Sequence, residues 1–313
     1  MIFSILTFSI FNYFYSMICP PKLVPGDVIA LVSPAKAIEA SFIDFATDYF
    51  EKQGYTVLVG PHTATAYRYF SGTDKERASD LQWAVDHPEV KAIVCARGGY
   101  GAIRLFDLVN WANLLREPRW ILGFSDITNF HCLGLKLGIE TAHTTMPLNF
   151  RENSPESLES LLNVLSGKPN KYTWESHAAN KPGTVVGTVV GGNLSILYAL
   201  LGTPYSPVYD GTILVIEDIG EQVYHLDRML WAFRLAGVFD RIAGLIVGGM
   251  TDLKDTATPT QWTVEELILE HTHYCSFPIA FQAPVGHISD NRAFICGRKA
   301  TFTVTENHIS FIQ

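Results

Sequence analysis

The chain has 313 residues, of which 48% are hydrophobic, so it is long enough to bury the cores of two domains. Its formal net charge of -8 and its 23 scattered Lys and Arg residues provide no basic surface for a phosphate backbone, which argues against nucleic acid as a partner. The cysteines are far apart and form no C-x-x-C pair, so we expect reduced, mostly buried thiols rather than disulfides or a thiolate zinc site. They are Cys19, Cys95, Cys132, Cys275 and Cys296.

The first residues decide the expected compartment. Met1 to Ser16 are apolar and aromatic but contain no Lys or Arg. The segment is shorter than the roughly 20 residues of a spanning helix and lacks the basic region of a secretory signal. We therefore interpret residues 1–22 as a leader or a mis-assigned start, with Met17 as the favoured start and a cytoplasmic protein as the expectation. Export or membrane anchoring through residues 1–19 is the alternative.

From Leu23 to about Met146, short apolar runs alternate with amphipathic stretches of helical length. This alternation predicts an N-terminal α/β domain over residues 23–150, with a parallel sheet covered by helices. Ligands bind at the carboxyl ends of the strands in such sheets, so the loops after Val32, Cys95 and Gly123 are of interest. The expected strands are 28–32, 55–59, 92–95 and 120–123, and the expected helices are 41–53, 75–85 and 103–108.

The composition becomes polar after Asn149, and we interpret residues 151–183 as a link between domains. Ser154 and Pro155 followed by an apolar periodic run ending at Gly167 predict one capped helix within it. Residues 184–313 read as a smaller, β-rich C-terminal domain. Its expected strands are 185–190, 212–216, 245–247 and 301–304, and its expected helices are 224–235 and 263–273.

One short stretch has the layout of a nucleophile elbow. The apolar strand Trp120 to Gly123 runs toward a helix, and Ser125 occupies the junction. On such a turn the hydroxyl projects from the sheet edge, and the next backbone N–H, from Asp126, points to where an oxyanion forms. Because Ile127 replaces the second glycine of the pattern G-x-S-x-G, an ordinary helix N-cap explains this stretch equally well.

A glycine-rich loop follows the strand Ala92 to Cys95 and is expected at the same sheet edge. Its glycines let the backbone approach a ligand, so the Gly99 N–H is a candidate second oxyanion donor. Arg97 and Tyr100 of this loop are candidate substrate contacts. A phosphate-binding loop is the rival, but the Lys-Ser or Lys-Thr of a P-loop is missing. A tight turn without a ligand remains open.

A serine nucleophile needs a base and a group that orients the base. His287 lies in a loop flanked by Gly286 and Asn291, and Glu217 follows the apolar strand 212–216. From spacing alone, a surface histidine and a solvated carboxylate explain these two residues equally well. His271 and His273 are two positions apart and do not share a helix face, so we expect no catalytic metal and no cofactor.

Taken together, the motifs resemble the LD-carboxypeptidase family, the muramoyltetrapeptide carboxypeptidases, to which the microcin C immunity peptidases are related. The resemblance spans nearly the whole chain from Leu23. It rests on Pro25-Gly26-Asp27, Val32 to Ala35, Arg97 to Gly101, Gly123 to Asp126, Gly191 to Ser195, Glu217-Asp218 with Glu221, Asp227-Arg228 and Gly286-His287.

The resemblance implies a catalytic triad of Ser125, His287 and Glu217, with the Gly99 and Asp126 N–H groups as the oxyanion hole. Glu221 competes for the orienting role, and Glu217 is preferred as the first glutamate after the strand. The implied reaction releases the terminal D-alanine from a murein tetrapeptide during peptidoglycan recycling, and the implied assembly is a homodimer. Two alternatives are a microcin C immunity-like peptidase acting on aminoacyl-nucleotide analogues and an inactive murein-peptide-binding module.

Overall fold

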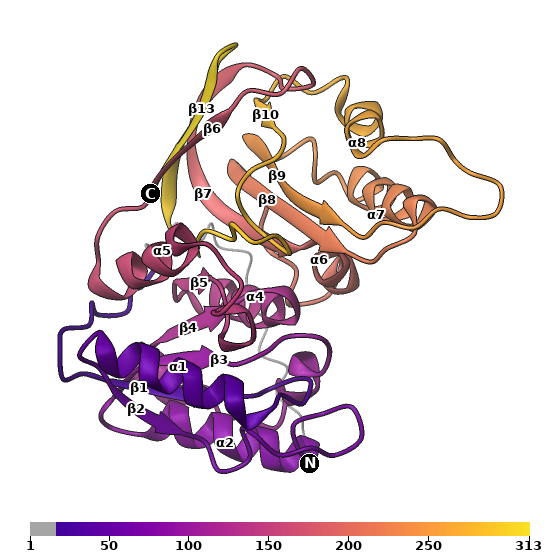
Figure 1. Cartoon of the computed structure of the whole chain (residues 1–313). Helices are drawn as coiled ribbons and strands as arrows, with labels where there is room; N and C mark the ends of the chain where they lie inside the picture. The colour runs from indigo at the N-terminus through magenta and orange to yellow at the C-terminus, as the bar shows by residue number, and fades with distance from the viewer. Residues whose placement is uncertain (1–16) are drawn as a thin grey trace, which may run out of the picture.

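The computed structural model describes residues 17–313 and contains two β-sheets, each covered by helices (Figure 1). Residues 1–16 of the segment 1–22, interpreted above as a leader or a mis-assigned start, lie outside the described residues. Ile18 already belongs to the packed chain, because its N–H donates to the Gly138 carbonyl at 2.8 Å and its own carbonyl accepts from Glu140 at 2.9 Å. Within residues 17–313, no helix combines the length and apolar character that crossing a membrane requires.

The first sheet has the strand order β11-β5-β4-β3-β1-β2. All pairs are parallel except β11 with β5. The predicted parallel sheet is therefore confirmed, but β11 comes from the C-terminal part of the chain and completes the edge of this sheet. The strands are β1 (Val28–Val32), β2 (Thr56–Val59), β3 (Val90–Cys95), β4 (Trp120–Gly123), β5 (Thr141–His143) and β11 (Phe294–Cys296).

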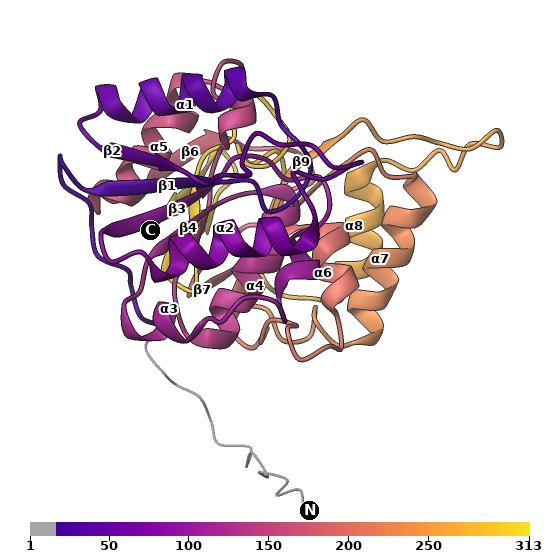
Figure 2. The same ribbon diagram turned by 90° about the horizontal axis from the view of Figure 1, so that it is seen from below.

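Alternate residues of the buried strands pack on opposite faces of this sheet. Ala30 and Val32 join one core with α2, α3 and α4, whereas Ile29 and Leu31 join another with α1 and α5. Figure 2 shows the two helix layers on either side of the strands. The helices are α1 (Ala40–Lys52), α2 (Asp74–Asp86), α3 (Ala112–Arg116), α4 (Thr128–Leu137) and α5 (Pro155–Ser166), with the 3-10 turns η1 (Ala102–Leu105), η2 (Ser125–Ile127) and η3 (Pro147–Asn149).

The second sheet is mixed, with the order β10-β9-β8-β7-β12-β13-β6. The run from β10 to β7 is parallel and the rest is antiparallel. Helices α6 (Leu194–Leu200), α7 (Val223–Leu235) and α8 (Val264–Thr272) pack on one face. The strands are β6 (Lys171–Glu175), β7 (Gly183–Asn193), β8 (Thr212–Ile219), β9 (Gly244–Thr251), β10 (Ile279–Ala280), β12 (Lys299–Val304) and β13 (His308–Ile312).

Most predicted elements match the observed ones within a few residues. The capped helix is confirmed as α5, where the Ser154 hydroxyl accepts from the Ser157 N–H and Gly167 adopts the left-handed conformation. The helix expected over residues 103–108 is instead the short turn η1, which ends at Leu105. The stretch expected to link the domains also contains β6, which pairs with β13. The domain boundaries themselves stay a prediction.

The expectation of mostly buried cysteines is confirmed. Cys95, Cys132, Cys275 and Cys296 are buried free thiols, and Cys19 alone is exposed. Burial raises the pKa of the Cys132 thiol to about 12, which keeps it protonated and unreactive. These thiols therefore contribute to packing.

Candidate active site

Ser125 is held in a strained turn after β4. Its φ angle is 62°, in the left-handed region that a residue with a Cβ rarely adopts. The carbonyl of Gly123, two residues before Ser125, accepts from the Thr144 N–H at 3.1 Å and contacts His131 Nε2 at 3.0 Å. Such strain costs about 1–3 kcal/mol and persists only where the surroundings enforce it, as at functional sites. The strand therefore leads into η2 through an elbow and not directly into an α-helix.

Three side chains distant in sequence form one hydrogen-bonded chain. Nε2 of His287 lies 3.1 Å from the Ser125 hydroxyl, and Nδ1 of the same ring lies 2.6 Å from Oε2 of Glu217. Ser125 follows the first sheet, whereas Glu217 belongs to β8 of the second sheet. The structure thus brings together the serine, base and carboxylate that the sequence suggested, in the connectivity of a nucleophile, a base and a group that orients the base.

Gly286 makes the approach of these groups possible. Its φ angle is 102°, and a Cβ added there would lie 2.6 Å from Cβ of Glu217 and 2.7 Å from its Oε2. Any side chain at residue 286 would thus push the turn away from β8. The buried Glu217 carboxylate and the His287 ring can touch only because this position is glycine.

The electrostatics of the pair raise the proton affinity of His287. Glu217 is fully buried, and its Oε1 has no hydrogen-bond partner among residues 17–313. Burial of His287 favours the neutral ring, but the charge and hydrogen bond of Glu217, with a smaller contribution from Asp218, outweigh burial and raise the pKa of His287. Glu217 thereby increases the proton affinity of the ring that faces the Ser125 hydroxyl.

The glycine-rich loop after β3 packs directly against the elbow. A Cβ added to Gly98 would lie 3.0 Å from Cβ of Ser125 and 3.2 Å from the Asp126 nitrogen. The Asp126 carboxylate accepts the Ala102 N–H at 2.8 Å and so ties the loop to the serine turn. Burial raises the pKa of this carboxyl, although the N–H donors around it act in the opposite direction. The sequence suggested the Asp126 N–H but gave no sign of this bracing role of its side chain.

The remaining predicted contacts lie on the same loop. Gly99 is exposed with a φ angle of 103°, and a Cβ there would lie 2.9 Å from Cβ of Lys36. Arg97 donates from Nη1 to the Ala37 carbonyl at 2.8 Å, so part of its guanidinium braces a neighbouring loop. Tyr100 is 48% exposed, which leaves its ring accessible to a ligand.

Glu221, the competing carboxylate, lies in a separate network. Its Oε2 contacts His225 Nδ1 at 2.5 Å, and its Oε1 accepts the Ser195 hydroxyl at 3.0 Å. Ser195 Oγ also lies 2.6 Å from Oδ2 of Asp218, so the two carboxylates share its single proton. Glu221 is thus engaged elsewhere, while Glu217 contacts His287.

The histidines weighed as metal ligands do not converge. His271 Nε2 contacts Asp227 at 2.8 Å, and His273 Nδ1 contacts the Glu270 carbonyl at 2.8 Å. In the part of the chain that the structure describes, no group of three or more His, Cys, Asp or Glu residues is arranged to hold a metal ion.

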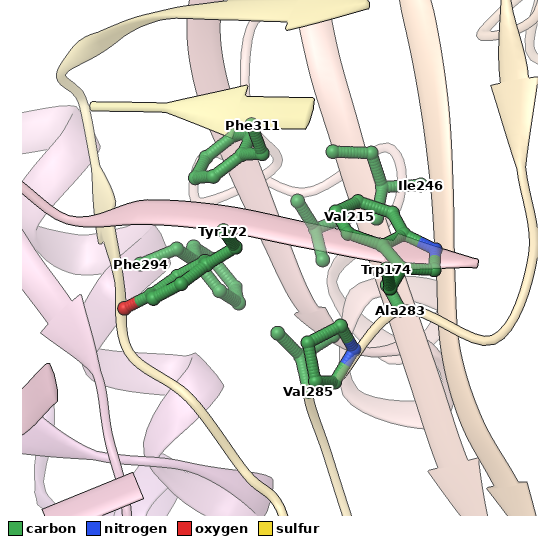
Figure 3. A pocket seen from close by; sticks show the side chains of 9 residues that line it. Tyr172, Trp174, Val215, Ile246, Ala283, Val285, Phe294 and Phe311 are labelled. Atoms are coloured by element: carbon green, nitrogen blue, oxygen red, sulfur yellow. The ribbon is translucent and has the colours of Figure 1, made fainter. Parts of the chain in front are cut away.

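A small apolar cavity of about 10 Å³ lies beneath the turn that carries His287. Figure 3 shows Val215, Ile246, Val285 and Phe294 converging on it. The one hydroxyl of its lining belongs to Tyr172 and donates to the Ala293 carbonyl at 2.8 Å. A space of one water volume with apolar walls is too small and too dry for a peptide, so this cavity is a packing defect and not the substrate site.

Comparisons with known proteins identify the class. The LD-carboxypeptidase N-terminal domain matches residues 29–144, and the C-terminal domain of the same family matches residues 186–302. These two matches cover most of the chain and both sheets. The protein therefore belongs to the LD-carboxypeptidase family of serine peptidases.

Individual relatives agree with this assignment. A murein tetrapeptide carboxypeptidase of Pseudomonas aeruginosa is 32% identical over 288 residues, covering 87% of this chain and 92% of its own. A microcin C7 self-immunity protein of Escherichia coli is 26% identical over 262 residues, covering 72% and 76%. The crystal structure of a muramoyltetrapeptide carboxypeptidase from Oxalobacter formigenes superposes with a TM-score of 0.84 at 26% identity, covering 91% of this chain and 98% of that one.

The strain at Ser125 predicts an unusual order of stability. Ser125→Gly should be more stable to urea than Ser125→Ala by about 1 kcal/mol, because only glycine tolerates a φ of 62° without strain. The matched pair Ser79→Gly and Ser79→Ala, on the exposed face of α2, should show the opposite order by about 1 kcal/mol. The same order at both positions would contradict a strained elbow.

Proposed function

We propose that the protein is a serine LD-carboxypeptidase that releases the terminal D-alanine from murein tetrapeptide. The observation that carries the proposal is the chain of contacts from Ser125 Oγ through the His287 ring to the buried Glu217 carboxylate, at 3.1 and 2.6 Å. The substrate class is supported by the names of the relatives from Pseudomonas aeruginosa and Oxalobacter formigenes.

In the proposed mechanism, Ser125 Oγ attacks the carbonyl of the diamino acid that precedes D-alanine, while His287 Nε2 takes the hydroxyl proton. Glu217 stabilises the resulting imidazolium and holds Nδ1 as the donor. The oxyanion of the tetrahedral intermediate accepts from the Gly99 and Asp126 N–H groups. Collapse breaks the peptide bond, and His287 returns the proton to the amine of D-alanine. Water then hydrolyses the acyl-enzyme by the same route in reverse.

Arg97 and Tyr100 are the proposed contacts for the substrate, and both belong to the glycine-rich loop that lies against Ser125. An exopeptidase must hold a free carboxylate, and guanidinium groups match carboxylates in geometry and charge. The homodimer implied by the family resemblance and the absence of a cofactor stay predictions.

The first test measures substrate class and nucleophile together. Wild-type protein incubated with L-Ala-γ-D-Glu-meso-diaminopimelate-D-Ala should release D-alanine, detected by mass spectrometry, and Ser125→Ala should release none while remaining folded. Ser79→Ala, which removes an exposed hydroxyl of α2, should retain full activity. If the folded wild type fails to release D-alanine, the proposal is wrong for murein peptide. Aminoacyl-nucleotide analogues and peptide-binding measurements then distinguish the alternatives.

The raised pKa of His287 predicts the acid side of the pH profile. The base works only when its ring is neutral, so kcat/KM should fall as the pH drops through a value above the usual histidine value of about 6.5. Glu217→Gln removes the charge that raises the pKa, so this limb should move to lower pH and kcat should fall about 10³–10⁴-fold. An unchanged limb in Glu217→Gln would contradict the assignment of Glu217.

The close packing of the glycine-rich loop predicts a sensitive position. Gly98→Ala places a methyl group 3.0 Å from Cβ of Ser125 and 3.2 Å from the Asp126 nitrogen, and should displace both the serine and this oxyanion donor. We expect kcat to fall about 10²–10³-fold with little change in KM, as when one oxyanion donor is removed. Thermal unfolding provides the control. Full activity in a folded Gly98→Ala protein would exclude this donor.

A further inference from the structure

Two polar side chains behind the triad are completely buried. His143 ends β5, and its Cα is the register partner of Gly123 at the end of the serine strand. Asn291 lies five residues after Gly286, beyond the turn that carries His287. They therefore stand on opposite sides of the boundary between the serine elbow and the turn of the base.

The contacts between these residues fix their chemistry. Asn291 Oδ1 accepts the Gly286 N–H at 2.7 Å and lies 2.9 Å from His143 Nε2. A backbone N–H can only donate, so Asn291 must present its oxygen to Gly286. An amide oxygen can only accept, so Nε2 of His143 must carry the proton. His143 is thus a neutral ring that donates to the same atom that holds Gly286.

The surroundings of His143 keep it in this form. Burial lowers its pKa to about 4, so the ring stays neutral over the whole neutral pH range. It stacks on Phe294 with ring centroids 4.5 Å apart. Its Nδ1 has no hydrogen-bond partner among residues 17–313, so in this tautomer it is a buried acceptor without a donor.

We propose that His143 and Asn291 form a positioning pair, which transmits the position of the serine strand to the turn that carries the base. The proposal rests on the proposed function of the Ser125, His287 and Glu217 site. Neither residue touches the reacting atoms. Their effect passes through the hydrogen bond from the Gly286 N–H to Asn291. Gly286 is the residue directly before His287.

Gly286 is held from two sides, and this explains why the pair matters. The Glu217 side chain packs against its Cα, and Asn291 holds its N–H. The far side of the turn has separate anchors, because the Ser289 carbonyl accepts from Asn153 Nδ2 at 2.9 Å and from the Ser154 N–H at 2.8 Å. Loss of the pair should therefore loosen the turn at Gly286 while leaving it attached.

Packing adds a second path between the pair and the base. The Phe124 ring packs against both histidines, with its centroid 5.6 Å from that of His143 and 4.8 Å from that of His287. The titratable groups that raise the pKa of His287 are Glu217 and Asp218, and the charge of His287 in turn lowers the pKa of His143. A shift of Gly286 would chiefly change the contact of His287 with Glu217, since that contact is the shortest.

Kinetics of three variants test the pair. Asn291→Ala and His143→Met remove the acceptor or the donor, and kcat should fall about 10–100-fold at nearly constant KM, because a displacement of about 1 Å can cost 10²-fold. In His143→Gln, the side-chain amide can still donate to Asn291, so kcat should stay within about threefold of wild type. His143→Met keeps the test decisive if Asn291→Ala does not fold.

A control separates positioning from general destabilisation. Tyr172→Phe removes a buried hydrogen bond to the Ala293 carbonyl, two residues after Asn291, without touching Gly286. It should lower the unfolding temperature but leave kcat unchanged. An equal loss of kcat in Tyr172→Phe and His143→Met would show that both act through stability alone, and this would overturn the proposal.

A measurement without turnover separates this proposal from the proposed function. In full-length Ser125→Ala protein with ¹³C-labelled histidine, the pKa of His287 is followed by NMR. It should stay raised with His143→Gln or Tyr172→Phe and fall with His143→Met or Asn291→Ala, as the Glu217 contact loosens. If the pKa of His287 is the same in all four variants as in the Ser125→Ala parent, the positioning role of His143 and Asn291 is refuted, even if the tetrapeptide is cleaved. A shift confined to the last two would support it even if the tetrapeptide is not.

Discussion

The hydrogen bond between the fully buried Glu217 carboxylate and the His287 ring is the interaction on which the site depends. A carboxylate without water is strongly disfavoured unless a donor compensates it, and only one of its two oxygens has a partner among the described residues. Protonation of His287 relieves that penalty. The buried Glu217 carboxylate therefore raises the proton affinity of His287 and fixes which ring nitrogen faces Ser125.

This interaction constrains the backbone on both sides of it. The turn of His287 can reach β8 only through a glycine at residue 286, and the serine reaches the ring only from a strained left-handed conformation. Neither feature stabilises the fold by itself. Both are maintained because the two sheets place their strand ends opposite each other, with side chains such as Asp126 bracing the loops between them.

Local sequence pattern predicted the local structure well. The strands 28–32 and 120–123 were predicted at their observed bounds. A short apolar run that ends at turn residues is typical of a buried strand, so the run itself marks where the strand begins and ends. The same patterns led to Ser125 and to the glycine-rich loop. Glu217 and Glu221 could not be separated by spacing, since both follow the same apolar run, and family resemblance supplied that choice. Only the packed structure shows which carboxylate is buried against His287.

Interactions between distant parts of the chain were not predictable in this way. Nothing in the short run 294–296 indicates that it pairs with residues 141–143 of the first sheet, because hydrophobic periodicity carries no information about the partner strand. The buried roles of His143 and Asn291 were missed for the same reason. The role of a single histidine such as His143 can be assigned only when its hydrogen-bond partner is known, and that partner, Asn291, lies 148 residues later in the chain.

The pairing of β11 with β5 also has a consequence for biosynthesis. The ribosome completes β5 about 150 residues before it completes β11. At elongation rates of about 5–20 residues per second, this edge of the first sheet stays without its last strand for roughly 8–30 s. His287 emerges in the same late segment. The nascent chain therefore exposes an unpaired strand edge, and the contact of Ser125 with His287 forms only after this late segment has been made.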